Sequence, residues 1–192
     1  MNDTTKKLTK IAILGALAAV LMWIEFAIPP FPSFYKLDFS EVPVLLGAFS
    51  MGPLEGIAIE AVKIIIKLLI KPTSTMFIGE LANFVVGVAL VVPSALIYTR
   101  NKTKKNAIIG MAAGTLCMGI AGALFNYFVL LPMYVNVMGL DAILGAASDM
   151  AVIKDLKTLV IFGTFPFNII KGVIVSVVTT LMYKHLSPLL HR

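Results

Sequence analysis

Long runs of apolar residues dominate this chain and limit the folds that it can adopt. The runs at about 8–28, 76–98 and 158–184 each have roughly 20 residues or more, the length of an α-helix that crosses the hydrocarbon core of a membrane. Hydrophobic residues make up 59% of the 192 residues and charged residues only 14%, and the mean hydropathy is +0.95. Soluble domains have about a quarter of their residues charged. The composition therefore predicts an all-α integral membrane protein.

The apolar pattern predicts a bundle of six transmembrane helices in a single domain, residues 1–192. Their approximate ranges are 8–28, 41–51, 53–71, 76–98, 106–134 and 158–184. The second helix is short, because its span corresponds to roughly 16 Å at 1.5 Å per residue, about half of the hydrocarbon core. Short, interrupted helices are typical of binding sites in transporters. We therefore expect the extended segment before residue 41 to help cross the membrane and to form a lid over a pocket.

The basic residues between the apolar runs predict the orientation of the bundle, since cytoplasmic loops are enriched in Lys and Arg. With the N-terminus inside, the cytoplasmic set is Lys6, Lys7, Lys10, Arg100, Lys102, Lys104, Lys105, Lys184 and Arg192. The outer set is smaller and consists of Lys36, Lys71, Lys154 and Lys157. We expect a multi-pass protein of the bacterial cell membrane with both termini cytoplasmic and the segment FYKLDFSEVP, residues 34–43, outside. No cleavable signal peptide is expected, because the first apolar run lacks a small-residue cleavage site.

The sequence lacks the residues that several kinds of chemistry require. Both histidines lie in the last eight residues and Cys117 is the single cysteine, so we expect neither a metal site nor a disulfide. We find no glycine-rich phosphate loop and no nucleophile paired with a base within the apolar runs. The net charge of +6 comes from basic residues spread between the runs, which does not favour nucleic acid as a partner. We expect no enzyme activity and no resident cofactor.

Polar side chains inside the apolar runs are the main candidates for function. An ionisable group at membrane depth costs at least about 2.5–3.5 kcal/mol, so it normally faces the interior of the bundle. Asn168 and Lys171 are three residues apart in FPFNIIKGVIV and therefore share one face of the last helix. The other candidates are Glu80, Asn83, Asn126, Tyr127 and Tyr134. Amides, a lysine and tyrosines suit a flat, uncharged heterocycle, whereas the structural alternative is that the amides only join helices.

Other charged residues have simpler interpretations, and they leave a second function open. Glu25 and Glu80 lie near segment ends, where they can reach lipid headgroups, and Lys67 can extend to the interface. Glu60 and Lys63 are three residues apart and can form an ion pair on one helix. The second hypothesis is a self-sufficient ion-coupled carrier that uses Glu60, Lys63 and Glu80. A third, an intramembrane enzyme acting on lipids, lacks a visible nucleophile and base.

The first helix carries small residues at four-residue spacing in AILGALAAVL. Ala12 with Ala16, and Gly15 with Ala19, form two such pairs, which let another helix approach closely. The pairs lie in the cytoplasmic half, away from the expected pocket. We expect this stripe to be the docking surface for a partner subunit.

The expected lid combines rigid, aromatic and charged residues. Pro30 and Pro32 restrict their own backbone and the residues before them. Phe31, Phe34, Tyr35 and Phe39 offer aromatic faces to a flat ring. Lys36, Asp38 and Glu41 can close the edge of the pocket or pair with one another across the lid.

The stretch FPSFYKLDFSEVPVLLGAFSMGPLEG, residues 31–56, resembles the substrate-binding S components of energy-coupling factor (ECF) vitamin transporters, in particular those specific for riboflavin. The alanine-rich first helix and NIIKG, residues 168–172, share this resemblance. An S component for another vitamin, such as thiamine or biotin, is the alternative. The resemblance implies that riboflavin is the transported ligand, and that the partners are a transmembrane coupling subunit and two cytoplasmic ATPases that use ATP. It also implies that the bundle topples in the membrane to present the vitamin inside.

The resemblance further implies which residues contact the ligand. Lys36, Leu37, Asp38, Phe39, Glu41 and Leu45 would cap the isoalloxazine ring from the lid and the second helix. Asn83, Asn126, Asn168 and Lys171 would hold its polar edge and the ribityl chain, next to Glu80, Tyr127 and Tyr134.

Overall fold

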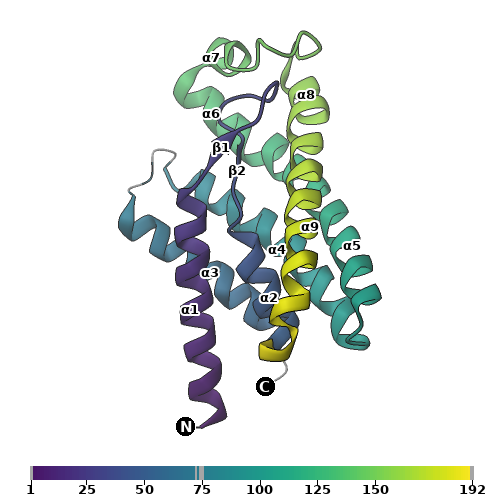
Figure 1. Cartoon of the computed structure of the whole chain (residues 1–192). Coiled ribbons are helices and arrows are strands. Elements are labelled where there is room, and N and C mark those ends of the chain that lie inside the picture. Colours follow the sequence, from purple (N-terminus) through teal and green to yellow (C-terminus); the bar gives the residue numbers. More distant parts are fainter. Residues whose placement is uncertain (1, 72, 74–75, 191–192) are drawn as a thin grey trace.

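The helices of the structure, a computed structural model, follow the predicted apolar runs (Figure 1). The structure is described for residues 2–71, 73 and 76–190, and for residues 184–190 this description covers the backbone alone. The first helices are α1 (Asp3–Trp23), α2 (Glu41–Met51), α3 (Pro53–Ile70) and α4 (Ile78–Arg100). A continuous rod follows, made of α5 (Lys104–Phe125), the π-helix η1 (Asn126–Leu130) and α6 (Leu131–Met138). The last rod comprises α8 (Leu156–Thr158), the π-helix η2 (Leu159–Thr164) and α9 (Phe165–Leu190).

Local sequence signals set where several helices begin. Gly52 has a φ of +129°, which separates α2 from α3, and Pro53 occupies the first turn of α3, where its missing N–H costs nothing. Thr103 accepts a hydrogen bond from the backbone of Asn106 and caps α5. Asp155 caps α8 in the same way through Thr158.

Two parts of the fold differ from the prediction. Residues 24–28 were expected in the first helix, but α1 ends at Trp23 and the chain continues into β1 (Phe26–Ala27), which pairs antiparallel with β2 (Lys36–Leu37). The prolines at 29 and 30 disfavour helical backbone at residues 28 and 29, and Phe26 and Ala27 pair with β2 instead. The short helix α7 (Leu140–Gly145) lies between the predicted ranges 106–134 and 158–184, where no helix was expected. The fold is thus mostly helical with a small hairpin.

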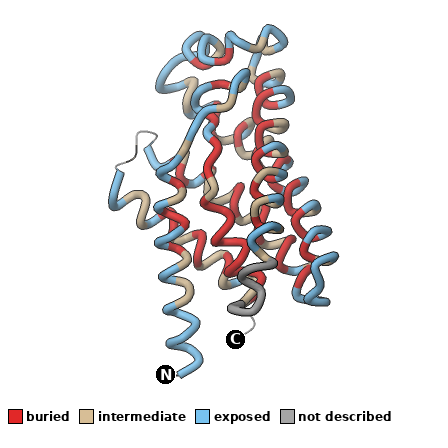
Figure 2. The backbone as a smooth tube through the Cα atoms, in the orientation of Figure 1, coloured by how far each residue is buried: buried red, intermediate tan, exposed pale blue. Residues whose placement is uncertain are grey.

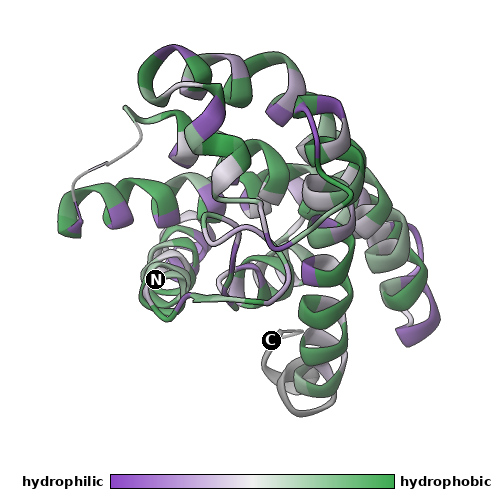
Figure 3. Ribbon diagram, turned by 90° about the horizontal axis from the view of Figure 1, so that it is seen from above, coloured by the Kyte–Doolittle hydropathy of each residue, from purple (hydrophilic) through white to green (hydrophobic). Residues whose placement is uncertain are grey.

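Three of the described helical stretches are long and apolar enough to cross a membrane. They are Ile78–Arg100, Lys104–Met138 and Leu156–Tyr183. Large apolar side chains on the outside of the bundle are strongly exposed, including Leu69 at 81%, Phe128 at 68% and Leu181 at 66%. Figure 3 shows that hydrophobic residues predominate along the helices. An apolar exterior of this kind is suited to lipid, so this is a multi-pass membrane protein.

The molecule has two distinct ends (Figure 1). The hairpin of β1 and β2 lies towards the end that carries α7, which we call the hairpin end. The start of α1 and the end of α9 lie at the opposite end, which we call the terminal end. Figure 2 shows that the first half of α1 is exposed, while α2 is largely buried inside the bundle.

Two separate clusters of buried apolar residues form the core. The larger one surrounds α2 and includes Val44, Leu45, Leu90 and Met118. The smaller one lies near the hairpin end and includes Tyr35, Leu131, Leu159 and Phe167. Along α4 and α9 the polar residues Asn83, Asn168 and Lys171 lie between members of the two clusters. A polar layer therefore divides the core at mid-depth.

Candidate functional site

The polar layer borders a cavity of about 370 Å³ near the hairpin end. Ligand pockets typically have volumes of about 300–1,000 Å³. Residues from α1, the segment 31–40, α3, α4, η1, α6 and α9 line it. The predicted site residues in this lining are Lys36, Asp38, Glu80, Asn83, Asn126, Tyr134, Asn168 and Lys171. The structure thus brings residues from most of the chain to one pocket.

Three asparagines of the pocket are held in the same way by their own helices. Asn83 donates to the carbonyl of Gly79 at 3.2 Å, Asn126 to that of Gly122 at 2.8 Å, and Asn168 to that of Thr164 at 2.9 Å. Each bond joins a side chain to the carbonyl four residues earlier, which fixes the amide in one orientation. The buried Oδ1 of Asn126 accepts no hydrogen bond within the described part of the chain. These amides are therefore preorganised to bind a partner with donors and acceptors of its own.

Both π-helical segments lie beside these asparagines. η1 begins at Asn126, and η2 ends at Thr164, whose carbonyl accepts from Asn168. Pro132 and Pro166 follow the two segments, and the carbonyl four residues before each proline lies inside the π-helix. A proline ring clashes with that carbonyl in a regular α-helix, and the wider π-turn relieves the clash. A proline inside an apolar run, close to an asparagine, is the sequence signal that could have predicted them.

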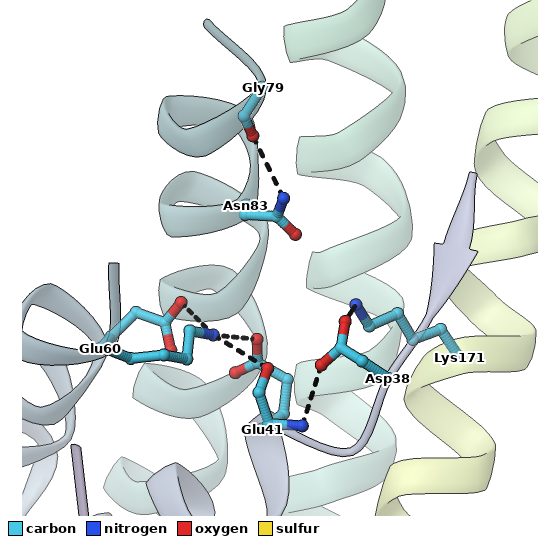
Figure 4. Close-up of polar contacts among 8 residues, drawn as sticks. Asp38, Glu41, Glu60, Gly79, Asn83 and Lys171 are labelled. Atoms are coloured by element: carbon cyan, nitrogen blue, oxygen red, sulfur yellow. Dashed lines mark hydrogen bonds and ion pairs between the residues drawn. The ribbon is translucent and has the colours of Figure 1, made fainter. Parts of the chain in front are cut away.

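Lys171 and Asp38 form a buried ion pair across the pocket, with 2.7 Å between Nζ and Oδ2 (Figure 4). Each side chain is only 5% exposed. The other carboxylate oxygen of Asp38 accepts from the backbone amide of Ser40 at 2.8 Å. The lysine that the sequence placed at membrane depth thus has the counter-charge that it requires, and this pair joins the segment 31–40 to α9.

Further ion pairs surround the rim of the pocket. Glu25 lies 3.2 Å from Lys36 and 3.5 Å from Lys71. Glu80 pairs with Lys67. The expectation that Glu80 and Lys67 extend separately to the membrane surface is therefore wrong, because they are partners between α4 and α3.

Aromatic residues line the cavity from the segment 31–40, which we call the lid after the role predicted for it. Tyr35 stacks on Phe167 with the ring centres 5.3 Å apart and a 25° angle, and Phe31 meets the same ring edge-on. The hydroxyl of Tyr35 forms a hydrogen bond with that of Thr164 at 2.5 Å. Phe34 and Tyr35 line the pocket. The lid is therefore attached to the last rod by ring contacts as well as by Asp38.

Five predicted contact residues lie outside the pocket lining. Leu37 and Leu45 are buried in the core, where apolar side chains on β2 and α2 pack. Phe39 packs against Phe26, and Tyr127 against Phe128. Glu41 is bound to Lys63 instead of the cavity.

Of the two roles expected for the charged residues Lys36, Asp38 and Glu41, pairing with one another is wrong. Lys36 binds Glu25, and Asp38 binds Lys171. Glu41, just after the lid, binds Lys63. The three residues therefore connect this part of the chain to three different places: the segment after α1, α9 and α3.

Several lining residues were not predicted as site residues from the sequence. They are Met22, Glu25, Lys67, Lys71, Gly79, Ala82, Val86, Leu130 and Phe167. Phe34 and Tyr35, which were expected to offer aromatic faces to a ring, line the pocket as well. The apolar members carry no signal that separates them from core residues. Within the described residues, no group of three or more His, Cys, Asp or Glu is arranged to hold a metal ion.

The small-residue stripe of α1 is divided between two faces. Gly15 and Ala19 are buried, and a Cβ atom on Gly15 would lie 2.5 Å from a methyl group of Val62 in α3. Gly15 thus packs against α3 within this chain and Ala19 is buried as well, so neither is exposed for the predicted docking of a partner. Ala12 and Ala16 are exposed.

The fold and site define a helical membrane protein with a pocket for a small molecule near one end. The model of the family described as "ECF transporter, substrate-specific component" matches residues 6–183. This chain therefore belongs to the substrate-specific components of ECF transporters. Members of this kind are transport proteins and not enzymes.

The chain is similar to characterised relatives over nearly its full length. It is 35% identical to the riboflavin transporter FmnP of Bacillus subtilis, over 95% of this chain and 93% of that protein. It is 37% identical to the riboflavin transporter RibU of Staphylococcus aureus, over 97% of this chain and 93% of that protein. A solved structure described as "the S component of a bacterial ECF transporter" superposes with a TM-score of 0.79, at 35% identity, over 99% of this chain and 100% of that one.

The ion pair between Asp38 and Lys171 leads to a stability prediction. Replacing Asp38 by Asn keeps the acceptor for Ser40 but leaves the Lys171 ammonium buried without a counter-charge. We expect this variant to lose about 3–5 kcal/mol of stability, and the double variant D38N/K171M to regain most of it. Denaturant unfolding of the purified protein in detergent measures both. Equal losses in the single and double variants would show that the pair is not coupled.

Proposed function

We propose that this chain binds riboflavin at the outer face of the bacterial membrane and delivers it into the cell as the S component of an ATP-driven ECF transporter. The proposal includes one domain, six membrane crossings and both termini in the cytoplasm. A transmembrane coupling subunit and two cytoplasmic ATPases are the partners. The full-length similarity to riboflavin transporters supports the choice of ligand.

The observation that carries this proposal is the pocket at the hairpin end. Preorganised amides lie on its α4, η1 and α9 sides, and aromatic rings lie on its lid side. A flavin has the complementary features, since its ring system is flat and apolar on its faces and carries hydrogen-bonding groups along one edge. Aromatic faces favour stacking, and amides supply both donors and acceptors.

Within this pocket we assign the faces of the isoalloxazine ring to Phe34, Tyr35 and Phe167. Its polar edge and the ribityl hydroxyls are assigned to Asn83, Asn126 and Asn168. Lys171, held by Asp38, directs a charged donor into the same space. Tyr134 and Glu80 complete the polar lining.

Replacing one amide tests the ligand and the site together. The protein purified in detergent should bind riboflavin, with quenching of flavin fluorescence as the readout, and neither thiamine nor biotin should compete. Asn168→Ala removes hydrogen bonds worth about 0.5–1.5 kcal/mol each, so we expect roughly a three- to thirtyfold weaker affinity. Asn101→Ala, which alters an exposed residue at the terminal end, is the matched control. Absence of riboflavin binding would reject the function, and an unchanged Asn168→Ala affinity would remove that residue from the site.

The lid leads to a separate prediction about how riboflavin changes backbone hydrogen exchange. A ligand beneath residues 33–41 adds contacts to Phe34, Tyr35 and the Asp38–Lys171 pair, so riboflavin should slow backbone hydrogen exchange there. Exchange followed by mass spectrometry, with and without the vitamin, measures this effect, and the basic turn at residues 100–105 serves as the internal control. If saturated protein exchanges at the same rate as empty protein in residues 33–41, the lid does not close over the ligand.

The exposed part of the α1 stripe gives a third prediction. A tryptophan at Ala12 or Ala16 should block close approach of a partner helix and abolish ATP-dependent uptake, while riboflavin binding is unchanged. Ile13→Trp is the control, because Ile13 is 62% exposed on a neighbouring face of the same helix. Uptake is measured in cells that contain the coupling subunit and the ATPases. Normal uptake by both alanine variants would place the partner surface elsewhere.

A further inference from the structure

Beneath the pocket, a single lysine is enclosed by two carboxylates (Figure 4). The Nζ atom of Lys63 lies 2.7 Å from Glu41 Oε1 and 2.6 Å from Glu60 Oε1. It also donates to the hydroxyl of Ser40 at 3.3 Å. All three charged side chains are at most 2% exposed. This cluster of Glu41, Glu60 and Lys63 does not line the pocket.

The carboxylate oxygens of the cluster need more donors than their surroundings provide. Neither oxygen of Glu60 accepts a well-formed hydrogen bond within the described residues, and Oε2 of Glu41 also lacks one. The Lys63 ammonium donates to Ser40 and Glu41, and it forms an ion pair with Glu60 without a well-formed hydrogen bond. Buried acceptors without donors cost free energy, so a further hydrogen atom is required here.

Helix α4 packs against this cluster at Gly87, which has no side chain. A Cβ atom on Gly87 would lie 2.5 Å from Glu60 Oε1 and 3.1 Å from Glu41 Oε1. Both oxygens are thus close to one point, and the α4 residue there has no side chain that could donate to them. The missing donor cannot come from this side of the cluster.

The balance of charge also indicates that the cluster lacks a proton. The groups around Glu60 are Glu41 from α2, Lys63 from α3, Asp38 from the lid and, beyond Asp38, Lys171 from α9. Lys171 is already paired with Asp38, and one turn above Lys63 the pair of Lys67 and Glu80 is neutral. Lys63 alone therefore faces two carboxylates, which leaves one uncompensated negative charge if both are ionised. Two carboxylates at one buried site do not both stay ionised.

We propose that Glu60 and Glu41 form a proton-binding site, in which Glu60 retains one proton at neutral pH and donates it to the Glu41 carboxylate. The geometry selects Glu60 as the protonated partner, because Glu41 accepts a hydrogen bond from Lys63 whereas neither oxygen of Glu60 accepts a well-formed one, although Oε1 is in ion-pair contact with Lys63. The ligand of this site is the proton itself, shared between α3 and the first residue of α2.

The position of the site connects it to the lid. Glu41 follows directly after the lid, and Lys63 binds both Glu41 and Ser40. Loss of the proton to solvent leaves two negative charges competing for Lys63 and weakens its attachment to Glu41. The base of the lid is then held less firmly, so affinity for the pocket ligand falls as pH rises. This consequence rests on the proposed function, whereas the protonated carboxyl does not.

The direct test is spectroscopic and needs no vitamin. Infrared spectra of the purified protein at neutral pH should contain the C=O band of a protonated buried carboxylic acid. The band should be absent from Glu60→Gln and present in Glu55→Gln, the control on the same helix, whose carboxylate pairs with Lys7 at the terminal end. A spectrum of Glu60→Gln that keeps the whole band overturns the proposal.

The functional test measures riboflavin affinity from about pH 6 to about pH 9. In the wild type and in Glu55→Gln the dissociation constant should rise by roughly tenfold, the equivalent of about 1.4 kcal/mol. Glu60→Gln, which mimics the protonated acid, should keep the low-pH affinity across the whole range. An identical pH dependence in Glu60→Gln overturns the link to the lid. Failure of all proteins to bind riboflavin would reject the proposed function, while the infrared band would still decide the proton site.

Discussion

The burial of charge at mid-depth is the constraint on which the rest of this structure depends. An ionised side chain removed from water costs several kcal/mol unless an opposite charge meets it. Lys63 on α3 and Lys171 on α9 meet carboxylates from the chain between residues 38 and 41. Because these partners come from distant parts of the sequence, the segment before α2 has to pass between the helices. The same two ion pairs therefore place the lid, the short helix and the floor of the pocket.

Glycines make room for this polar layer. A Cβ atom on Gly122 would lie 2.7 Å from the amide nitrogen of Asn168, and one on Gly87 would lie 2.5 Å from Glu60. The absent side chains allow α5 and α4 to approach polar groups closely without a steric clash. The carbonyl of Gly122 also holds Asn126. Small residues thus contribute to the site by giving space to neighbouring amides and carboxylates.

The sequence predicted the helices well because their signal is local, and predicted the site only in part because its contacts are distant. Apolar length alone located α2 at residues 41–51. Depth within an apolar run identified Asn168 and Lys171, since a polar group there needs a partner. It could not identify Asp38 as that partner, because 133 positions separate the two residues. Apolar lining residues such as Phe167 and Val86 could not be predicted, since a pocket wall and a protein core are built from the same types of apolar side chain.

The division of the core into two apolar clusters has a consequence for cooperativity. Contiguous apolar packing makes a protein open as one unit, whereas a polar layer between two clusters lets one side open while the other stays intact. The cluster around α2 contains most of the continuous packing, and the smaller cluster includes lid residue Tyr35. A flat, partly apolar molecule in the cavity would touch Val86 on one side and Tyr35 and Phe167 on the other. Such a molecule would bridge the two apolar clusters and become, while bound, a part of the protein's core.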